Sequence, residues 1–327
     1  MEEVQSKQNG SSKSVDERDA SGSSSSVYQE KVAVAPTSKD ATHYRMSSNM
    51  RGHAVIFNHE HFKISGLNSR SGTQMDCLNL ESMMKELGFL VTVCENYEFN
   101  QIKMKITELA REDHTNYDCL MIIVLSHGEH GMLYAKDVIY KPELLWTPFV
   151  ADLCPTLAGK PKLFFFQACQ GDKLDSGIHM IRTETDGQPP NHFRIPSQAD
   201  FLFAYSTVPG YYSWRNTTRG SWYMQALCEE LKESAHKYDL LTILTFVNRR
   251  VAVDYESNVP DKVHMHKQKQ IPCVTSMLTR LVQFNQLGSN VTIDCNREND
   301  AKTADSSKSK RNFFTSMFGT KKNYRVN

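Results

Sequence analysis

Short apolar runs alternate with amphipathic stretches through the middle of the chain. The runs are rich in β-branched and aromatic residues and are bounded by polar or glycine-containing segments, which predicts buried strands at 53–57, 89–94, 119–125, 162–168, 200–206 and 274–284. Between several of these runs, apolar residues recur at helical spacing. The alternation predicts an α/β fold of three layers (αβα), in which helices cover both faces of a mostly parallel six-stranded sheet.

The helical stretches differ in how clearly their ends are marked. In the segment 73–87, apolar residues recur every three or four positions, and Gly88 is placed to end the helix. Asn100 is expected to cap the next helix, whose buried side carries Ile102 and Ile106. The remaining predicted elements are helices at 142–153, 221–235 and 239–252, and a hairpin-like pair at 132–135 and 138–140.

Composition divides the chain into one folded domain and three polar segments. Residues 1–50 are rich in Ser, Lys and Glu and hold few large apolar residues, which predicts a disordered leader. The segment 172–197 has no periodicity, and a loop of that length inside a domain is typically functional. The tail 287–327 turns basic and aromatic, which fits a disordered extension or an element that binds a partner or a membrane surface. The folded domain is therefore expected at 51–286.

Charge and cysteine usage exclude several classes of protein. The chain has 38 Lys and Arg against 37 Asp and Glu, so no overall field points to a nucleic-acid partner. The eight cysteines form no CxxC pairs, which fits free thiols in a reducing compartment and argues against a zinc site. No signal-peptide core opens the chain and no apolar stretch reaches 18 residues. We expect a cytoplasmic protein with no membrane span, no metal and no cofactor.

Two of the predicted strands end in residues that can carry chemistry. The strand at 162–168 leads into Gln167-Ala168-Cys169-Gln170-Gly171, and the strand at 119–125 leads into Ser126-His127-Gly128. Parallel strands bring their carboxyl ends to one edge of a sheet, where α/β folds bind ligands. An imidazole, a thiol and the backbone N–H of a glycine would meet at this edge. These groups are the ones that nucleophilic catalysis by a cysteine requires.

The pentapeptide around Cys169, with a histidine upstream, resembles the active-site signature of the caspases. The resemblance covers roughly residues 51–284 and is to executioner caspases with a short prodomain, of the invertebrate type. It implies a cysteine endopeptidase in which Cys169 is the nucleophile and His127 the base. The backbone N–H groups of Gly128 and Cys169 would form the oxyanion hole. The sequence marks no Asp or Asn side chain that would orient His127, a task that a backbone carbonyl performs in caspases.

Two further segments resemble those that form the caspase pocket for the P1 side chain. Ser69-Arg70-Ser71-Gly72-Thr73 would supply one arginine, Tyr211-Tyr212-Ser213-Trp214-Arg215-Asn216 the other, and Gln167 an amide. Two guanidiniums clamp a carboxylate by charge-assisted bonds, which implies Asp at P1. The resemblance implies substrate contacts also for Tyr212, Ser213, Trp214, Asn216 and Trp222, of which Asn216 and Trp222 match positions that favour Asp at P4.

The long loop contains a sequence of the kind that caspases cut. Cleavage after Asp186, in Glu184-Thr185-Asp186-Gly187, would separate a large subunit with both catalytic residues from a small subunit that begins at Gly187. The resemblance then implies a zymogen that an upstream initiator caspase activates. In the leader, Asp19 and Asp40 each precede an alanine, and the sequence does not choose between them. The leader is too short and polar for an adaptor domain, which favours the executioner type.

The resemblance also implies partners. Residues 271–278 resemble the edge strand through which caspases form homodimers of large and small subunit pairs, and an exposed apolar edge otherwise invites aggregation. The other implied partners are protein substrates with Asp at P1 and inhibitor-of-apoptosis proteins. Two other functions stay open. A non-catalytic caspase-like scaffold is disfavoured by the intact cysteine and histidine, and a metacaspase-like protease with basic specificity would need an acidic pocket instead of Arg70 and Arg215.

Overall fold

A computed structural model describes residues 33–175 and 196–284, which are built around a six-stranded sheet. The strands lie in the order β11-β8-β7-β3-β1-β2. Their bounds are Gly52–Asn58 (β1), Phe89–Glu95 (β2), Leu120–Leu125 (β3), Lys162–Gln167 (β7), Phe201–Tyr205 (β8) and Cys273–Ser276 (β11). Neighbouring strands are parallel except for β8 and β11, which are antiparallel. The predicted mostly parallel, six-stranded sheet is confirmed.

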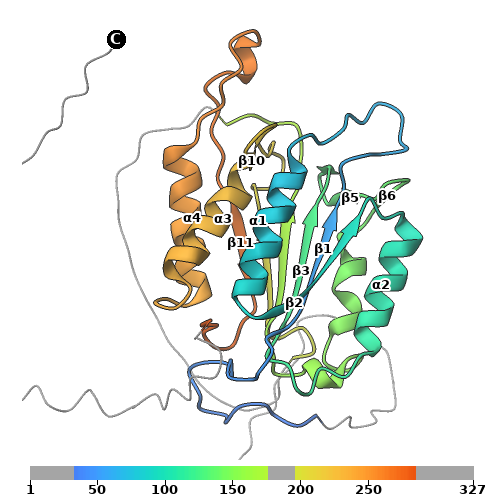
Figure 1. Cartoon of the computed structure of the whole chain (residues 1–327), viewed down its shortest axis with the longest axis vertical. Coiled ribbons are helices and arrows are strands. Elements are labelled where there is room, and N and C mark those ends of the chain that lie inside the picture. The colour runs from blue at the N-terminus through green and yellow to red at the C-terminus, as the bar shows by residue number, and fades with distance from the viewer. Residues whose placement is uncertain (1–32, 176–195, 285–327) are drawn as a thin grey trace, which may run out of the picture. The chain divides into compact units, whose positions relative to one another are not determined.

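Helices cover both faces of this sheet (Figure 1). The helices are α1 (Thr73–Glu86), α2 (Phe99–Arg111), α3 (Trp222–Ser234) and α4 (Leu240–Asp254). On β3, Ile123 packs into the layer of α1, α3 and α4, whereas Ile122 packs into the layer of α2, because successive side chains on a strand point to opposite faces. The predicted three-layer fold is confirmed. Within the described residues, no helix is long and apolar enough to cross a membrane.

Two predictions about helices are wrong. Asn100 does not cap α2, because the helix begins at Phe99 and Glu98 is its N-cap residue; the Gln101 side chain accepts the Glu98 backbone N–H at 2.9 Å. The segment 142–153 is not an α-helix. It forms two short 3-10 helices, η1 (Pro142–Leu145) and η2 (Thr147–Phe149), since Pro148 lacks the N–H that a continuous helix would need. A third, η3 (Pro155–Leu157), follows, and η4 (Val263–Met265) lies after α4.

The last strand is shorter than its apolar pattern predicts. β11 ends at Ser276, whereas the pattern predicted a strand to residue 284. The N–H of Met277 still donates to the carbonyl oxygen of Phe201 at 2.8 Å, but the pairing then stops. Val282 and Phe284 are buried in the α1 layer of the core. The apolar pattern beyond Ser276 therefore reflects burial and not further pairing with β8.

Two small antiparallel sheets accompany the main one. β5 (Met132–Tyr134) and β6 (Ile139–Tyr140) form the predicted hairpin, and β4 (Gly128–Glu129) pairs with β5. A second hairpin joins β9 (Arg215–Asn216) to β10 (Gly220–Ser221) just before α3. β4 directly follows the end of β3, so this small sheet grows from the carboxyl edge of the main sheet.

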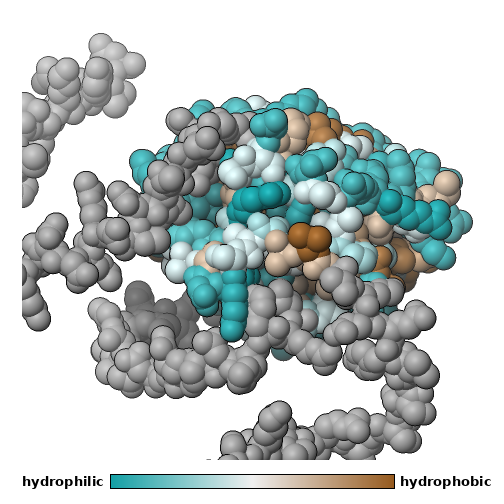
Figure 2. Space-filling model, turned by 90° about the horizontal axis from the view of Figure 1, so that it is seen from below, coloured by the Kyte–Doolittle hydropathy of each residue, from teal (hydrophilic) through white to brown (hydrophobic). Residues whose placement is uncertain are grey.

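The last part of the leader is folded onto the domain, so the prediction of disorder over 1–50 is wrong for residues 33–50. Tyr44 and Met46 are 4% and 5% exposed. The Tyr44 hydroxyl donates to Asp200 at 2.7 Å, and its N–H donates to the carbonyl oxygen of Leu281 at 3.0 Å. This segment, which we call the strap, crosses the lower end of Figure 1, and Figure 2 shows a mainly hydrophilic surface there. The other predicted segments, 1–32, most of 172–197 and 287–327, lie outside the described residues.

The strap gives a first prediction. Tyr44→Ala removes a buried ring and the donor to Asp200, so it should lower the free energy of unfolding by about 3 kcal/mol. Urea unfolding followed by tryptophan fluorescence measures the change. Val34→Ala is the matched control, since Val34 in the same segment is 91% exposed and its loss should leave stability unchanged. Equal stability of the two variants would contradict the packing of the strap.

Candidate active site

The carboxyl ends of β3 and β7 bring the two predicted catalytic residues together. Leu125 and Gln167 are register partners, and the N–H of Ser126 donates to the carbonyl oxygen of Gln167 at 3.1 Å. His127 and Cys169 each follow this pair by two residues. Because the strands are parallel and in this register, both residues emerge from the same edge of the sheet.

Gly128 lies where no side chain has room. A β-carbon there would be 2.6 Å from the carbonyl oxygen of Cys169 and 2.9 Å from the β-carbon of Ala168. Such distances are closer than real contacts, so only glycine lets β4 approach the chain at Cys169. The backbone at Gly128 is thereby held beside the residue that carries the thiol.

A backbone carbonyl holds the imidazole of His127. Its Nε2 lies 2.8 Å from the carbonyl oxygen of Asn68, so this nitrogen carries the proton of the neutral ring and Nδ1 is left as a hydrogen-bond acceptor. The ring of Phe62 packs against it at a centroid distance of 4.9 Å. Burial lowers the pKa of His127, the carbonyl opposes this shift, and two nearby arginines add to it, so the ring is neutral at pH 7. Asn68 and Phe62 were not identified from the sequence.

The thiol of Cys169 contacts the backbone of Ser213 in this uncut chain. The Ser213 N–H donates to Sγ at 3.4 Å, and Sγ lies 3.8 Å from the Ser213 carbonyl oxygen. Among the described residues, the hydrogen bonds of the sulfur do not include one to His127. Burial raises the pKa of Cys169, while the Ser213 N–H and the charges of Arg70 and Arg215 oppose the rise. The thiol is therefore protonated at neutral pH, which makes it a weak nucleophile in this form.

Arg70 is buried beside the thiol. It is 1% exposed, and its Nη1 donates to the carbonyl oxygen of His59 at 3.0 Å and to the hydroxyl of Thr73 at 2.8 Å. The Thr73 hydroxyl in turn donates to Asn58 at 2.7 Å, which fixes the guanidinium. Burial and the neighbouring charge of Arg215 lower the pKa of Arg70 to about 9. Two positive charges close together in a site with little access to water favour the binding of an anion.

Arg215 approaches from the β9–β10 hairpin. Its Nε donates to the carbonyl oxygen of Ser71 at 2.9 Å, next to Arg70 in sequence. Burial lowers the pKa of Arg215, and the charge of Asp76 opposes this most strongly. The structure thus brings together the two arginines that the sequence predicted, from segments 144 residues apart.

The side chain of Gln167 lies between the two halves of the site. Its Nε2 is 2.7 Å from the hydroxyl of Ser213, while its Oε1 is buried without a hydrogen-bond partner among the described residues. The Ser213 hydroxyl can accept or donate, so turning the amide over would satisfy the oxygen. Nε2 would then be available to an incoming carboxylate.

The predicted tryptophans form a stacked aromatic wall. The rings of Trp214 and Trp222 are 5.7 Å apart at 18°, and Trp222 stacks in turn on Tyr255 at 5.5 Å. The N–H of Trp214 donates to the side chain of Gln270 at 2.6 Å. Tyr255 and Gln270 carry no motif, so the sequence did not identify them.

The predicted outer residues differ in how available they are. The side-chain oxygen of Asn216 accepts the N–H groups of Thr218 and Arg219, both at 2.9 Å, and so closes the turn of the hairpin. Tyr212 is 37% exposed, and its N–H donates to the carbonyl oxygen of Lys173 at 2.9 Å. The side chain of Tyr212 is therefore accessible, whereas the oxygen of the Asn216 amide already accepts two hydrogen bonds within the hairpin.

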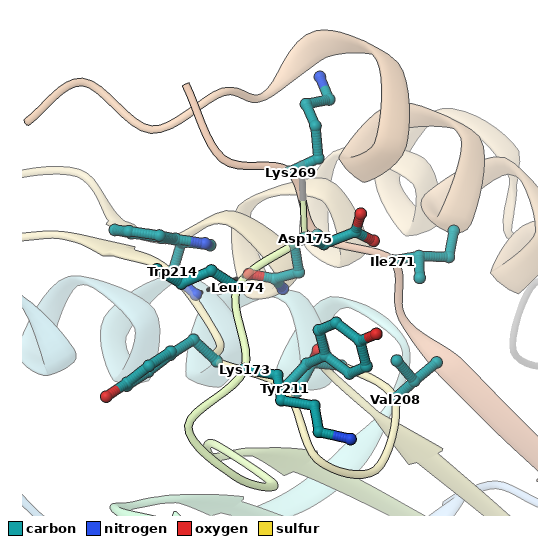
Figure 3. A pocket seen from close by; sticks show the side chains of 11 residues that line it. Lys173, Leu174, Asp175, Val208, Tyr211, Trp214, Lys269 and Ile271 are labelled. Carbon is teal, nitrogen blue, oxygen red and sulfur yellow. Dashed lines mark hydrogen bonds between the residues drawn. The ribbon is translucent and has the colours of Figure 1, made fainter. Parts of the chain in front are cut away.

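Main-chain bonds fix the segment that follows Cys169 to the loop 207–212. The N–H of Gly210 donates to the carbonyl oxygen of Gln170 at 2.7 Å, and the N–H of Lys269 donates to that of Asp175 at 2.8 Å. Figure 3 shows the cleft between these segments, lined by side chains that include Leu174 and Trp214. The described segment that follows Cys169 is therefore bonded to Tyr211 and Tyr212, directly before Ser213, whose backbone contacts the thiol.

The predicted cleavage sites are only partly described. Asp40 is exposed and lies in a turn in which the N–H of Ala41 donates to the carbonyl oxygen of Ser38 at 3.2 Å. Asp19 and Asp186 lie outside the described residues. Within residues 33–175 and 196–284, no three His, Cys, Asp or Glu side chains gather as metal ligands.

A family model described as the caspase domain matches residues 51–283. The chain belongs to the caspase family. It is 59% identical to Caspase-1 of Spodoptera frugiperda over 271 residues, which are 83% of this chain and 91% of that relative. It is 54% identical to Caspase drICE of Drosophila melanogaster over 265 residues, 80% of this chain and 78% of the relative.

Solved structures agree with this assignment. The crystal structure of Caspase-1 from Spodoptera frugiperda matches with a TM-score of 0.73 at 58% identity, and the match covers 78% of this chain and 99% of that chain. The structure of pro-sf-caspase-1 matches with a TM-score of 0.63 at 59% identity, over 78% and 98% of the two chains. This caspase is a cysteine-type endopeptidase of the executioner kind, specific for Asp and made as a precursor.

Gly128 gives a prediction about activity. Gly128→Ala places a methyl group 2.6 Å from the Cys169 carbonyl oxygen, so the backbone must shift and kcat/KM should fall at least about 100-fold. Hydrolysis of a fluorogenic Asp peptide measures the fall. Gly131→Asn is the control, because a β-carbon there meets nothing within 4 Å and asparagine tolerates its left-handed conformation. If both variants kept full activity, the close approach at Gly128 would not matter for catalysis.

The thiol gives a prediction about pH. Because burial raises the pKa of Cys169 in the uncut chain, the thiolate forms only as pH rises above the usual thiol range. Alkylation of Cys169 by iodoacetamide should therefore be slow at pH 7 and keep accelerating past pH 9. Peptide-level mass spectrometry separates Cys169 from the other cysteines, with Cys169→Ala as the blank. A plateau of the rate below pH 8 would contradict the raised pKa.

Proposed function

We propose that Cys169 and His127 are the catalytic pair of this caspase, and that Arg70, Arg215 and Gln167 select Asp at P1. The observation that supports the pocket is the buried guanidinium of Arg70 with the half-buried guanidinium of Arg215 beside it, neither of which forms an ion pair within the described residues. Buried charges are normally paired, so an anion from outside is the missing partner. The carboxylate of an Asp side chain fits this need.

The proposed chemistry uses the groups described above. Nδ1 of His127 takes the proton from the thiol as Sγ of Cys169 attacks the carbonyl carbon of the peptide. The oxyanion is stabilised by the backbone N–H groups of Gly128 and Cys169. His127 then gives the proton to the leaving amine, and water hydrolyses the acyl-enzyme that remains. The Asn68 carbonyl keeps the imidazole in the tautomer that this sequence of steps requires.

The remaining contacts belong to the rest of the substrate. We assign the stacked rings of Trp214 and Trp222, with Tyr212, to the side chains that precede P1, and Ser213 to the substrate backbone. Asn216 is assigned to an acidic P4 side chain through the part of its amide that the turn leaves open. A neutral residue at P1 would leave two arginines unpaired, so it should be rejected by roughly 10⁴-fold.

Cleavage after Asp186 is the proposed activating step, by an upstream initiator caspase. In the uncut chain, main-chain hydrogen bonds join the segment after Cys169 to the loop 207–212, next to the thiol. A cut would free this segment at one end and so allow these residues to rearrange around the thiol. We also assign removal of the leader to Asp40, which lies in an exposed turn, or to Asp19. The assigned domain extends from 51 to 286 between the leader and the basic-aromatic tail 287–327.

The proposed partners follow from the family and from the edge of the sheet. β11 ends the sheet order and pairs only with β8 in the described part of the chain, so a second copy could continue the sheet there as a homodimer. Protein substrates with Asp at P1 and inhibitor-of-apoptosis proteins are the other proposed partners, in the cytoplasm.

The proposed function is tested with matched tetrapeptides that end in Asp, Asn or Arg. The purified chain is assayed before and after cutting at Asp186, with Cys169→Ala as the blank. Turnover of the Asp peptide alone, appearing after the cut and lost in the blank, is expected. Turnover of the Arg peptide would mean that Arg70 and Arg215 do not form the P1 pocket, and no turnover in any form would mean a scaffold.

The pocket gives a separate prediction. Arg215→Gln should lower kcat/KM for the Asp peptide by about 100-fold or more, since a charge-assisted bidentate contact is lost. Arg219→Gln is the matched control, because Arg219 is exposed in the turn of the same hairpin. Equal losses in the two variants would show that the hairpin acts only through its overall charge.

A further inference from the structure

A buried carboxylate lies behind the P1 pocket. Asp76, in the first turn of α1, is 1% exposed. Both of its oxygens accept hydrogen bonds from one residue: Oδ1 accepts the N–H of Ser221 at 2.8 Å, and Oδ2 accepts its hydroxyl at 2.6 Å. The two-point contact fixes Ser221 in place as well as in orientation.

The backbone beside Ser221 is built for this contact. Gly220 has a φ of +93°, and a β-carbon there would lie 2.2 Å from Oδ1 of Asp76. No other residue could occupy this position without displacing the carboxylate. The close approach of β10 to α1 therefore depends on the pair Gly220 and Asp76.

The contact reaches Arg215 through the hairpin. Ser221 is the register partner of Arg215 in the β9–β10 pair, so fixing one strand fixes the other. On the far side, Nε of Arg215 donates to the carbonyl oxygen of Ser71, just before α1. The hairpin is thus attached to the start of α1 at two points, and the loop that carries Arg70 leads into the same helix.

Asp76 also matters to the charge of the pocket. Of the acidic groups near Arg70 and Arg215, it opposes most strongly the lowering of both arginine pKa values. Burial raises the pKa of Asp76 itself to about 6, against the bonds from Ser221 and the two positive charges. Burying a carboxylate costs stability, so packing of the core alone does not explain Asp76. Ionisable groups with strongly shifted pKa values cluster at functional sites.

We propose that Asp76 is a positioning residue for P1 recognition, which through Ser221 holds the β9–β10 hairpin so that Arg215 and Arg70 converge on one carboxylate. The proposal rests on the proposed P1 pocket. Asp76 precedes the linker and Ser221 follows it, so after cleavage the same two hydrogen bonds join the large subunit to the small one. Asp76 touches neither substrate nor thiol, and its effect is therefore expected in binding.

The test compares Asp76→Ala, Ser221→Ala and Asp76→Asn in the cut enzyme. The two alanine variants should raise KM for the Asp peptide about tenfold and leave kcat within about twofold, since a charge-assisted contact that only orients Arg215 is lost. Asp76→Asn should recover most of the loss, because an amide can accept the Ser221 N–H and donate to its hydroxyl. Ser221→Ala removes no buried charge, so it remains informative if Asp76→Ala does not fold.

Asp200→Ala is the matched control. Asp200 is equally buried and accepts bonds from Tyr44 and Thr279, at the far end of the sheet. It should lower the melting temperature and leave KM unchanged. Unchanged KM in both Asp76→Ala and Ser221→Ala would overturn the proposal, as would an Asp76→Asn variant as impaired as Asp76→Ala. If the wild-type enzyme cut Asn and Asp peptides equally, the P1 pocket itself would be wrong, which is a distinguishable result.

Discussion

The parallel pairing of β3 with β7 is the constraint on which the active site depends. The register places Leu125, the last residue of β3, opposite Gln167, the last residue of β7, and the second residue after each strand carries the imidazole or the thiol. A slip of one residue would turn the side chains of one strand to the other face and separate the two groups. The continuous apolar sequence of both strands, buried on two faces, therefore secures the chemistry as well as the core.

Charge is then concentrated at this edge at a cost to stability. Arg70 and Asp76 are buried and Arg215 is half-buried, and the pKa of each group moves in the direction that opposes its charged form. Hydrogen bonds to backbone carbonyls and to Ser221 compensate in part. In the proposed P1 pocket, a substrate carboxylate would supply the missing negative charge, so its binding would recover part of the free energy that burying these charges costs.

The sequence predicted those elements and site residues whose signal lies in a few contiguous residues. The parallel sheet, the helix at 73–87 and the residues His127 and Cys169 all followed from runs and motifs, because each is encoded by contiguous residues. The Asn68 carbonyl could not be found in this way, since every residue has a carbonyl and only the fold selects one. Asp76 was missed because a lone acid in a helix ordinarily faces solvent.

Other errors came from averaging over a segment. The leader is polar as a whole, yet Tyr44 and Met46 within it are buried against the domain. The mean composition of residues 1–50 does not reveal two individual buried side chains. In 142–153 the apolar spacing suited a helix, but Pro148 interrupts the hydrogen bonds that the helix requires. Beyond Ser276, Val282 and Phe284 pack into the core without continuing the pairing with β8, and an apolar pattern alone does not distinguish the two cases.

The bonds that hold the chain after Cys169 join main-chain atoms, at Gln170 with Gly210 and at Lys173 with Tyr212. Bonds of this kind carry no formal charge, so ionic strength weakens them little, in contrast to the charged pocket beside them. The side chains of Gln170, Lys173 and Tyr212 take no part in these bonds, but the two glycines of the loop are needed: a β-carbon at Gly171 would lie 2.5 Å from the backbone of Gly210, and Gly210 has a φ of +93°. The arrangement around the thiol is therefore insensitive to salt, and in this loop it depends on Gly171 and Gly210 and not on any charged side chain.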